Sequence, residues 1–423
     1  MKRRSIKSTS AVTEEKAREH VQLALNIGMT DEICGFRGLG STVVDNKPLI
    51  IHDLNGKVLF YEYEIKEGGA IVGVAKGSAD KLVGSAVPQI QLGPRGWSPE
   101  KSLKGAEDIV KKQYPNVKIS KSEFVCYSYP KIGVRIYIDD PRSGETSLIF
   151  DVSSLSLVET FGKVGFSGFT AWSFLNEVGE ADAVRRERRW ELQDEELETI
   201  KSEIPKLFGG SSESKDIKDV RRALTDYAMY QPNKLGTNIK PIPTPVPIPI
   251  TSQKIIQYCK HCPTHDCYAL HSQMTDHHCA VASGQMLFDF YRYYYDQNQI
   301  GTAMSIGPYG CSITGIMDGL KNLTYNCMNI TLDSTPTWGE AAAEIDNNRP
   351  LMTLIPGHAR TCFGWKASNI WIVDKPRPQW LYILDPWPWN SDICKGGAVY
   401  WEDWYAINHT YFIYLQHRTT PCK

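Results

Sequence analysis

A run of alternating prolines near the middle of the chain most strongly limits how it can fold. Every second residue is proline in the segment Lys-Pro-Ile-Pro-Thr-Pro-Val-Pro-Ile-Pro, which runs from Lys240 to Pro249. Proline fixes φ and has no backbone N–H, so this run cannot form a helix and favours an extended, polyproline-like conformation. We therefore interpret residues 232–252 as a linker between an N-terminal region and a C-terminal domain at 253–423.

The bulk composition is that of a globular protein. At 423 residues the chain exceeds one ordinary core, which predicts two or three domains. Hydrophobic residues make up 42% and charged residues 22%, near the globular average. The 47 Lys and Arg residues nearly balance the 48 Asp and Glu residues, so we expect no nucleic-acid partner. No stretch approaches the roughly 20 apolar residues of a membrane-spanning helix, so we expect no membrane span.

The cysteines and the N-terminus bear on the compartment. Met-Lys-Arg-Arg at the start is not followed by the apolar segment of a signal peptide. Cys34 and Cys126 lie in the first half, and the other nine cysteines lie within 259–423, where setting one thiol aside for catalysis leaves an even number suited to disulfides. With Asn-x-Thr sequons at Asn322, Asn329 and Asn408, this favours an extracytoplasmic or secreted protein, free cytosolic thiols being the alternative.

The N-terminal region predicts two α+β modules, at 1–97 and 98–175, each with a helix followed by a β-meander. In the first module, helix formers with apolar spacing at 13–27 precede alternating runs at 41–54, 57–65 and 70–76. In the second, Ser98 and Pro99 predict the start of a helix that reaches about Lys112. We expect its strands near 123–129, 132–138 and 146–152.

Residues 176–231 form a densely charged segment that follows these modules. Helical stretches are predicted at 183–192 and 219–229, with solvated faces. The repeated helix and meander, with Asp-Leu-Asn-Gly-Lys at 53–57, resemble the small PepSY-type modules and the pro-segments of streptopain-like peptidases.

A buried helix is predicted directly after Cys279. Small and large apolar residues recur with the spacing of one helical stripe at Ala280, Gly284, Leu287, Phe288 and Tyr291. Glycine costs about 1 kcal/mol inside a helix, so Gly284 indicates close packing at that point. A cysteine at a helix start has a lowered thiol pKa, because unpaired N–H groups and the positive end of the dipole favour the thiolate. By itself, such a cysteine is more often a packed small hydrophobe.

The residues around Cys279 favour the catalytic interpretation. Gln273 stands six residues before it, His358 lies between two strand-like runs, and Asp385 ends a further strand-like run with Trp387 two residues on. An imidazole can act as the base of a thiol, and a carboxylate can fix the tautomer of that imidazole.

The order Gln, Cys, His, Asp over residues 253–423 resembles papain-like cysteine peptidases, especially the group allied to double-glycine leader peptidases. The resemblance implies a papain-like domain in which the helix carrying the nucleophile packs on an antiparallel sheet, within an α+β chain. It also implies Cys279 as nucleophile, His358 as base, Asp385 as the group that orients the base, and Gln273 in the oxyanion hole. Trp387 resembles the family tryptophan that shields the His and Asp pair from water, although a core aromatic is the alternative.

Other groupings of reactive residues are weaker. Cys259, Cys262 and Cys267, near His261, His265 and His271, are a zinc alternative, but no second cysteine pair completes the set, so disulfides or free thiols are preferred. His277 and His278 precede the nucleophile directly and should point elsewhere. Gly165-Phe-Ser-Gly-Phe169 is not a nucleophile elbow, and the sequence has no phosphate-binding glycine loop.

We therefore predict a cysteine peptidase that hydrolyses a peptide or protein substrate through an acyl-enzyme and needs no cofactor. Residues 1–230 would be an inhibitory or chaperoning pro-region, so the chain would be a zymogen. A thiol-dependent amidase or acyltransferase uses the same residues, and a catalytically idle binding protein is the third alternative. The intact set of four residues argues against the last.

A candidate self-cleavage site lies before the linker. Glu203-Ile-Pro-Lys-Leu-Phe-Gly-Gly210 resembles a double-glycine leader, which points to the Gly210–Ser211 bond. A plain flexible linker is the preferred alternative, because Gly-Gly-Ser-Ser is typical of linkers and Pro205 departs from the helical leader pattern. Cleavage nearer the proline run is a further alternative.

Overall fold

The computed structural model describes residues 10–30, 42–140, 144–158, 171–203, 251–258, 268–368 and 378–418. Several sequence predictions lie outside these residues: the proline run, the helix at 219–229, the Gly165–Phe169 motif, the Gly210–Ser211 site, and the cluster of Cys259, Cys262 and Cys267.

The described residues form a mixed α+β fold with seven α-helices around a large, mostly antiparallel sheet. The order along the sheet is β10-β15-β11-β12-β13-β14-β5-β4-β3-β2-β6-β7-β8, with β1 beside β3 and β9 beside β12. Only the pairing of β2 with β6 is parallel among the described strands. None of the described helices is long and apolar enough to cross a membrane.

The N-terminal region contains two successive sets of one α-helix and several strands. The elements of the first are α1 (Glu14–Thr30), β1 (Val43–Val44), β2 (Leu49–Asp53), β3 (Val58–Glu67), β4 (Ala70–Ser78), the 3₁₀ helix η1 (Lys81–Val83) and β5 (Gln89–Leu92). Those of the second are α2 (Pro99–Gln113), β6 (Lys118–Ser128), β7 (Lys131–Asp140) and β8 (Gly144–Asp151). The expected cap of α2 forms, because the Ser98 side chain accepts from the backbone N–H of Lys101 at 3.3 Å.

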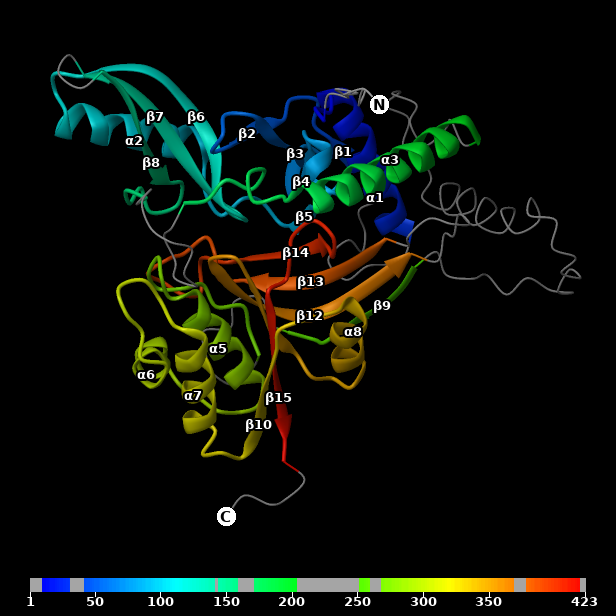
Figure 1. Cartoon of the computed structure of the whole chain (residues 1–423), viewed down its shortest axis with the longest axis vertical. Helices are drawn as coiled ribbons and strands as arrows, with labels where there is room; N and C mark the ends of the chain where they lie inside the picture. The colour runs from blue at the N-terminus through cyan, green and yellow to red at the C-terminus, as the bar shows by residue number, and fades with distance from the viewer. Residues whose placement is uncertain are drawn as a thin grey trace, which may run out of the picture.

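The described part of the charged segment, residues 176–203, contains one long helix, α3 (Glu180–Glu203), whose faces are not all solvated as expected. Trp190, Leu197 and Ile200 are buried on one side of it, and α3 crosses α1 on the outside of the N-terminal region (Figure 1). The charge density of the segment concealed this apolar stripe, because only a few large side chains form it.

The C-terminal domain has helices on both faces of its part of the sheet. Its elements are β9 (Thr251–Ile255), α5 (Cys279–Phe290), α6 (Gln297–Ala303), α7 (Ile313–Leu323), β10 (Met328–Asp333), α8 (Trp338–Asp346), β11 (Leu351–Ile355), β12 (His358–Ser368), β13 (Gln379–Asp385), β14 (Ala398–Asp403) and β15 (Tyr411–His417). The buried stripe after Cys279 is confirmed as the core of α5. A Cβ on Gly284 would lie 2.9 Å from the Met304 side chain, which explains the glycine.

One strand pairing joins the two regions that the linker separates in sequence. β5 of the N-terminal region pairs antiparallel with β14 of the C-terminal domain, from Val399 opposite Leu92 to Glu402 opposite Gln89. The sheet is therefore continuous across the boundary between the upper, blue-to-cyan part of Figure 1 and the lower, yellow-to-red part. The N-terminal region is an integral layer of the described fold.

Cysteine chemistry differs among the described residues. Cys126, Cys279, Cys311 and Cys362 are free and buried. Cys327 is disulfide-bonded, which confirms the prediction of at least one disulfide beyond residue 259. The even number of cysteines in this region does not mean that all of them pair, because Cys311 and Cys362 keep free thiols.

Candidate active site

Three elements bring Cys279, His358 and Asp385 to one place. Cys279 is the first residue of α5, His358 is the first residue of β12, and Asp385 is the last residue of β13. Because β12 and β13 are antiparallel neighbours, the start of one lies beside the end of the other. α5 packs on β12, where the Ser283 hydroxyl donates to the carbonyl oxygen of Ala359 at 3.1 Å. This bond fixes the helix next to the strand that carries the imidazole.

The imidazole of His358 is bonded to the carboxylate of Asp385. His358 Nε2 lies 2.6 Å from Asp385 Oδ1, and both side chains are fully buried. The backbone N–H of Trp387 donates to the same oxygen at 2.8 Å. The tautomer and plane of the ring are therefore set by a carboxylate that is itself held in place.

Asp385 and His358 each shift the pKa of the other toward its charged form. Burial alone would raise the pKa of Asp385, but the charge and hydrogen bond of His358, with contributions from Arg360 and Tyr400, hold it below its ordinary value. Burial alone would lower the pKa of His358, yet Asp385 and the Cys279 thiol raise it. Both shifts favour an imidazolium beside a carboxylate.

The thiol of Cys279 lies beside the other edge of the ring. Burial would raise its pKa, but His358, the Lys131 ammonium and the backbone of Ala359 lower it to about 7. His358 Nδ1 is the ring nitrogen left for the thiol, and it forms no conventional hydrogen bond in this state. By contrast, burial raises the pKa values of the Cys311 and Cys362 thiols to about 12. Cys279 is thus the free cysteine that these surroundings favour as a thiolate.

Gln273 is anchored at the same end of the site. Its backbone N–H donates to the carbonyl of Pro386 at 3.0 Å, and its own carbonyl accepts from Asn390 at 3.2 Å, so it is tied to the loop after Asp385. Its side-chain Nε2 donates to the carbonyl of Thr275 at 2.8 Å, and its buried Oε1 has no hydrogen-bond partner. In this state the amide is therefore engaged within the loop before α5.

The two histidines before Cys279 have other partners. His277 Nδ1 pairs with Asp276 at 2.5 Å, and His278 Nδ1 contacts the Thr275 hydroxyl. Burial and the neighbouring His277 lower the pKa of His278 to about 4. Neither ring forms a hydrogen bond with His358 or Asp385. The sequence also led us to expect that these two histidines point elsewhere.

The described residues contain no cluster of metal-ligating side chains. No group of three or more His, Cys, Asp and Glu residues among them is arranged to hold an ion. His271, the described member of the zinc alternative, lies 2.5 Å from Asp289 in a buried pair.

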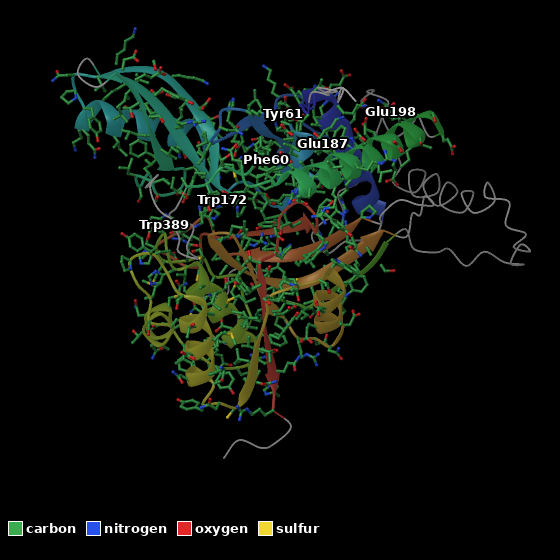
Figure 2. All side chains as sticks on the ribbon, in the orientation of Figure 1. Phe60, Tyr61, Trp172, Glu187, Glu198 and Trp389 are labelled. Carbon is green, nitrogen blue, oxygen red and sulfur yellow. The ribbon has the colours of Figure 1, made fainter. Side chains whose placement is uncertain are left out.

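The N-terminal region covers the active centre. A Cβ on Gly357, next to His358, would lie 3.1 Å from the Ser128 hydroxyl, to which Trp172 donates at 2.9 Å. Lys131, the first residue of β7, is 1% exposed, and its charge acts on both Cys279 and His358. In Figure 2, Trp172 lies at the boundary between the two regions. Cys279 is 3% exposed, so the thiol has little access to solvent.

Two further side-chain bonds hold the N-terminal region against the C-terminal domain. The indole N–H of Trp387 donates to Asp151 at 3.1 Å, and Asp151 also accepts from Tyr127 at 2.8 Å. The Tyr129 hydroxyl donates to Glu402 at 3.0 Å. The end of β8 therefore reaches the loop after Asp385, and the turn between β6 and β7 reaches β14.

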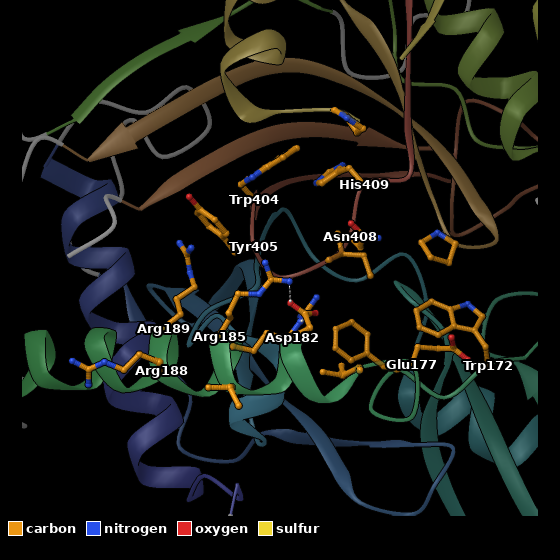
Figure 3. A pocket seen from close by; sticks show the side chains of 18 of the residues that line it. Trp172, Glu177, Asp182, Arg185, Arg188, Arg189, Trp404, Tyr405, Asn408 and His409 are labelled. Carbon is orange, nitrogen blue, oxygen red and sulfur yellow. Dashed lines mark hydrogen bonds and ion pairs between the residues drawn. The ribbon is translucent and has the colours of Figure 1, made fainter. Parts of the chain in front are cut away.

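A cavity of about 1060 Å³ lies beside this contact, between α3 and the loop 404–409. Figure 3 shows Arg185 and Arg189 of α3 pointing toward the loop that carries Trp404, Tyr405 and His409. Pro356, two residues before His358, lines its wall. The cavity thus begins near His358 in the sequence, and residues of both regions of the chain line it.

Sequence reasoning missed three buried polar residues behind the carboxylate of Asp385: Arg360, Tyr400 and Glu402. A signal for them exists in the sequence. Arg360 lies within β12, two residues after His358, and Glu402 directly follows the apolar run of β14. A charged residue inside a buried strand requires a partner, so these two positions predict an ion pair.

Comparison with known proteins finds no family model that matches the chain and no curated protein with significant sequence similarity to it.

Proposed function

We propose that this chain is a cysteine peptidase of papain-like mechanism, made as a precursor whose N-terminal region inhibits it. The observation that carries the proposal is the His358 to Asp385 bond of 2.6 Å beside a helix-start thiol whose pKa is lowered to about 7. A thiolate next to an imidazolium is the form that a cysteine nucleophile needs near neutral pH.

The reaction follows from the positions of these groups. The Cys279 thiolate attacks the peptide carbonyl carbon, and the electrons of the double bond move to the oxygen. When the tetrahedral intermediate collapses, the C–N bond breaks and His358 gives its proton to the departing amine, which leaves a thioester. His358 then takes a proton from water, whose oxygen attacks the thioester, and the acid product and the thiolate are released.

Asp385 and the start of α5 support this cycle. Asp385 keeps Nε2 of the ring protonated and Nδ1 directed at the thiol. The backbone N–H of Cys279, unpaired at the first turn of α5, would bind the developing oxyanion. The Gln273 amide would join it after release from Thr275, which makes the oxyanion site complete only when the loop rearranges.

The precursor part of the proposal is supported by the position of the N-terminal region over Cys279 and His358. Ser128 and Lys131 lie at the catalytic residues, and β5 extends the sheet at β14. A substrate chain cannot reach Cys279 while these residues stay in place, because the thiol is 3% exposed. The N-terminal region would thus act as an intramolecular inhibitor, which is released or cleaved on activation.

Peptide hydrolysis by activated protein tests the proposal. We expect Cys279→Ala to abolish cleavage of a casein substrate while its circular dichroism and melting temperature stay unchanged. Cys362→Ala removes another buried free thiol from the same domain and should keep activity. Cleavage that persists in Cys279→Ala would overturn the mechanism.

A further inference from the structure

The second carboxylate oxygen of Asp385 has a partner of its own. Asp385 Oδ1 accepts from His358 and Trp387, whereas Oδ2 accepts from the Tyr400 hydroxyl at 2.6 Å. A carboxylate held at one oxygen can rotate about its Cβ–Cγ bond, and a bond to the other oxygen stops this rotation. Tyr400 is 1% exposed, so water does not compete for the position.

Arg360 fixes the direction of the Tyr400 bond. Its Nη1 donates to the Tyr400 hydroxyl oxygen at 3.0 Å. A guanidinium donates and does not accept, so the hydroxyl must accept from Arg360 and use its own hydrogen toward Asp385. A hydroxyl that accepts from a cation becomes a stronger donor, because chained hydrogen bonds polarise one another.

Glu402 holds Arg360 in turn. The two terminal nitrogens of Arg360 donate to the two oxygens of Glu402 at 2.6 and 2.9 Å, in a fully buried bidentate pair. The Glu402 charge offsets that of Arg360, which would otherwise be drawn to Asp385 and compete with His358. The pairing therefore lets Arg360 orient Tyr400 without replacing the imidazole.

The sheet places these groups in one row. Arg360 lies on β12, two residues after His358, so both side chains share a face of the strand. Tyr400 and Glu402 share a face of β14 in the same way, and Tyr400 lies opposite Ile383, two residues before Asp385. Three adjacent strands thus carry the whole row as a rigid unit.

We infer that Tyr400, Arg360 and Glu402 form a positioning network for the catalytic carboxylate. The network sets the orientation of Asp385 and thereby that of the His358 ring. This inference rests on the proposed role of Cys279 and His358, and it adds residues that act through Asp385 rather than on the substrate.

The Tyr400→Phe variant of the full chain tests the network with little change of shape. NMR spectra are recorded on protein labelled with [¹⁵N]histidine, and the ring signals of His358 are assigned by their absence from the spectrum of His358→Ala. We expect the Nε2 proton of the wild type far downfield, as a short bond to a carboxylate requires. In Tyr400→Phe it should move upfield and exchange faster with water. After activation, kcat for peptide hydrolysis should fall about tenfold with little change in KM, the effect of losing one charge-assisted hydrogen bond.

Tyr382→Phe is the matched control. Tyr382 is equally buried, lies on β13, and its hydroxyl pairs with that of Tyr258 at 3.0 Å, away from the carboxylate. This variant should keep the wild-type His358 signal and kcat. Glu402→Gln, which removes the charge that holds Arg360, should disturb the His358 signal as Tyr400→Phe does.

The outcomes separate the inference from the proposed function. An unchanged His358 signal and kcat in Tyr400→Phe would overturn the network, as would equal losses in Tyr382→Phe. If Tyr400→Phe alters the His358 signal and Tyr382→Phe does not, while the wild type cleaves no peptide, the network stands and the peptidase proposal fails.

Discussion

At the scale of single residues, the surroundings of the sulfur distinguish Cys279 from the other buried thiols. His358 and Lys131 offset the burial that leaves Cys311 and Cys362 with pKa values of about 12. All of these thiols are buried, so the difference comes from charge and hydrogen bonding rather than from exposure.

This difference predicts a selective pH dependence. Because the folded pKa of Cys279 is lowered to about 7, its thiolate should persist as the pH falls to that value and be lost below it. Iodoacetamide modification of Cys279, followed by peptide mapping from pH 5 to 9, should therefore be half-maximal near pH 7. Cys311 and Cys362 should stay unmodified over the same range. A Cys279 midpoint near the ordinary thiol value would contradict the account.

The two partners of the thiol should differ in their contributions. His358→Ala removes the proton donor of the leaving amine and should lower kcat/KM by at least about a hundredfold. Asp385→Ala keeps the His358 imidazole but lets its ring rotate, so kcat/KM should fall less than in His358→Ala. Steady-state kinetics of the activated variants measures both. A larger loss in Asp385→Ala than in His358→Ala would mean that the roles are assigned wrongly.

At the scale of elements, the turn from Ser128 to Lys131 between β6 and β7 is the part of the N-terminal region that reaches the active centre. The Tyr129 hydroxyl of this turn donates a hydrogen bond of 3.0 Å to Glu402 and so attaches the turn to β14. Tyr129→Phe should loosen the turn and raise the rate of Cys279 alkylation about fivefold, since one hydrogen bond contributes about 1 kcal/mol.

A tyrosine of β7 supplies the control for this hydrogen bond. Tyr137→Phe removes a hydroxyl bonded to Glu123 at 2.7 Å within the N-terminal region. It should leave the alkylation rate unchanged. Equal rates in both variants and the wild type would show that the turn does not limit access to the thiol.

Elements set by local rules could be predicted from the sequence, and elements set by distant contacts could not. α2 begins where Ser98 and Pro99 indicated, because a cap depends on neighbouring residues. β5 was missed, because this short strand is defined by its pairing with β4 and with β14, some 300 residues later. The spacing of Gln273, Cys279, His358 and Asp385 indicated a site, but the positions of Lys131 and Tyr129 depend on tertiary packing.

At the scale of the whole molecule, continuity of the sheet sets the conditions under which the proposed precursor would be activated. The N-terminal region pairs with β14 and covers the thiol, so cutting the linker alone would leave both in place. Activation must also separate β5 from β14 or withdraw the turn from Ser128 to Lys131.

Processing in the segment between the regions gives a prediction at this scale. If the chain cleaves itself after its double glycine, mass spectrometry of protein matured at neutral pH should find a new N-terminus at Ser211. That product should be absent in Cys279→Ala and blocked by Gly210→Val, whose side chain a narrow groove excludes. A mature N-terminus elsewhere would move the site, toward the proline run in the first instance.

The identity of the nucleophile is the central claim, and covalent labelling tests it most directly. Activated protein is treated with a thiol-directed epoxide, digested and mapped by mass spectrometry. The account predicts one label per chain, on Cys279, with loss of peptidase activity in proportion, and much slower labelling in His358→Ala. Stoichiometric labelling of any other cysteine, with Cys279 left unmodified, would contradict it.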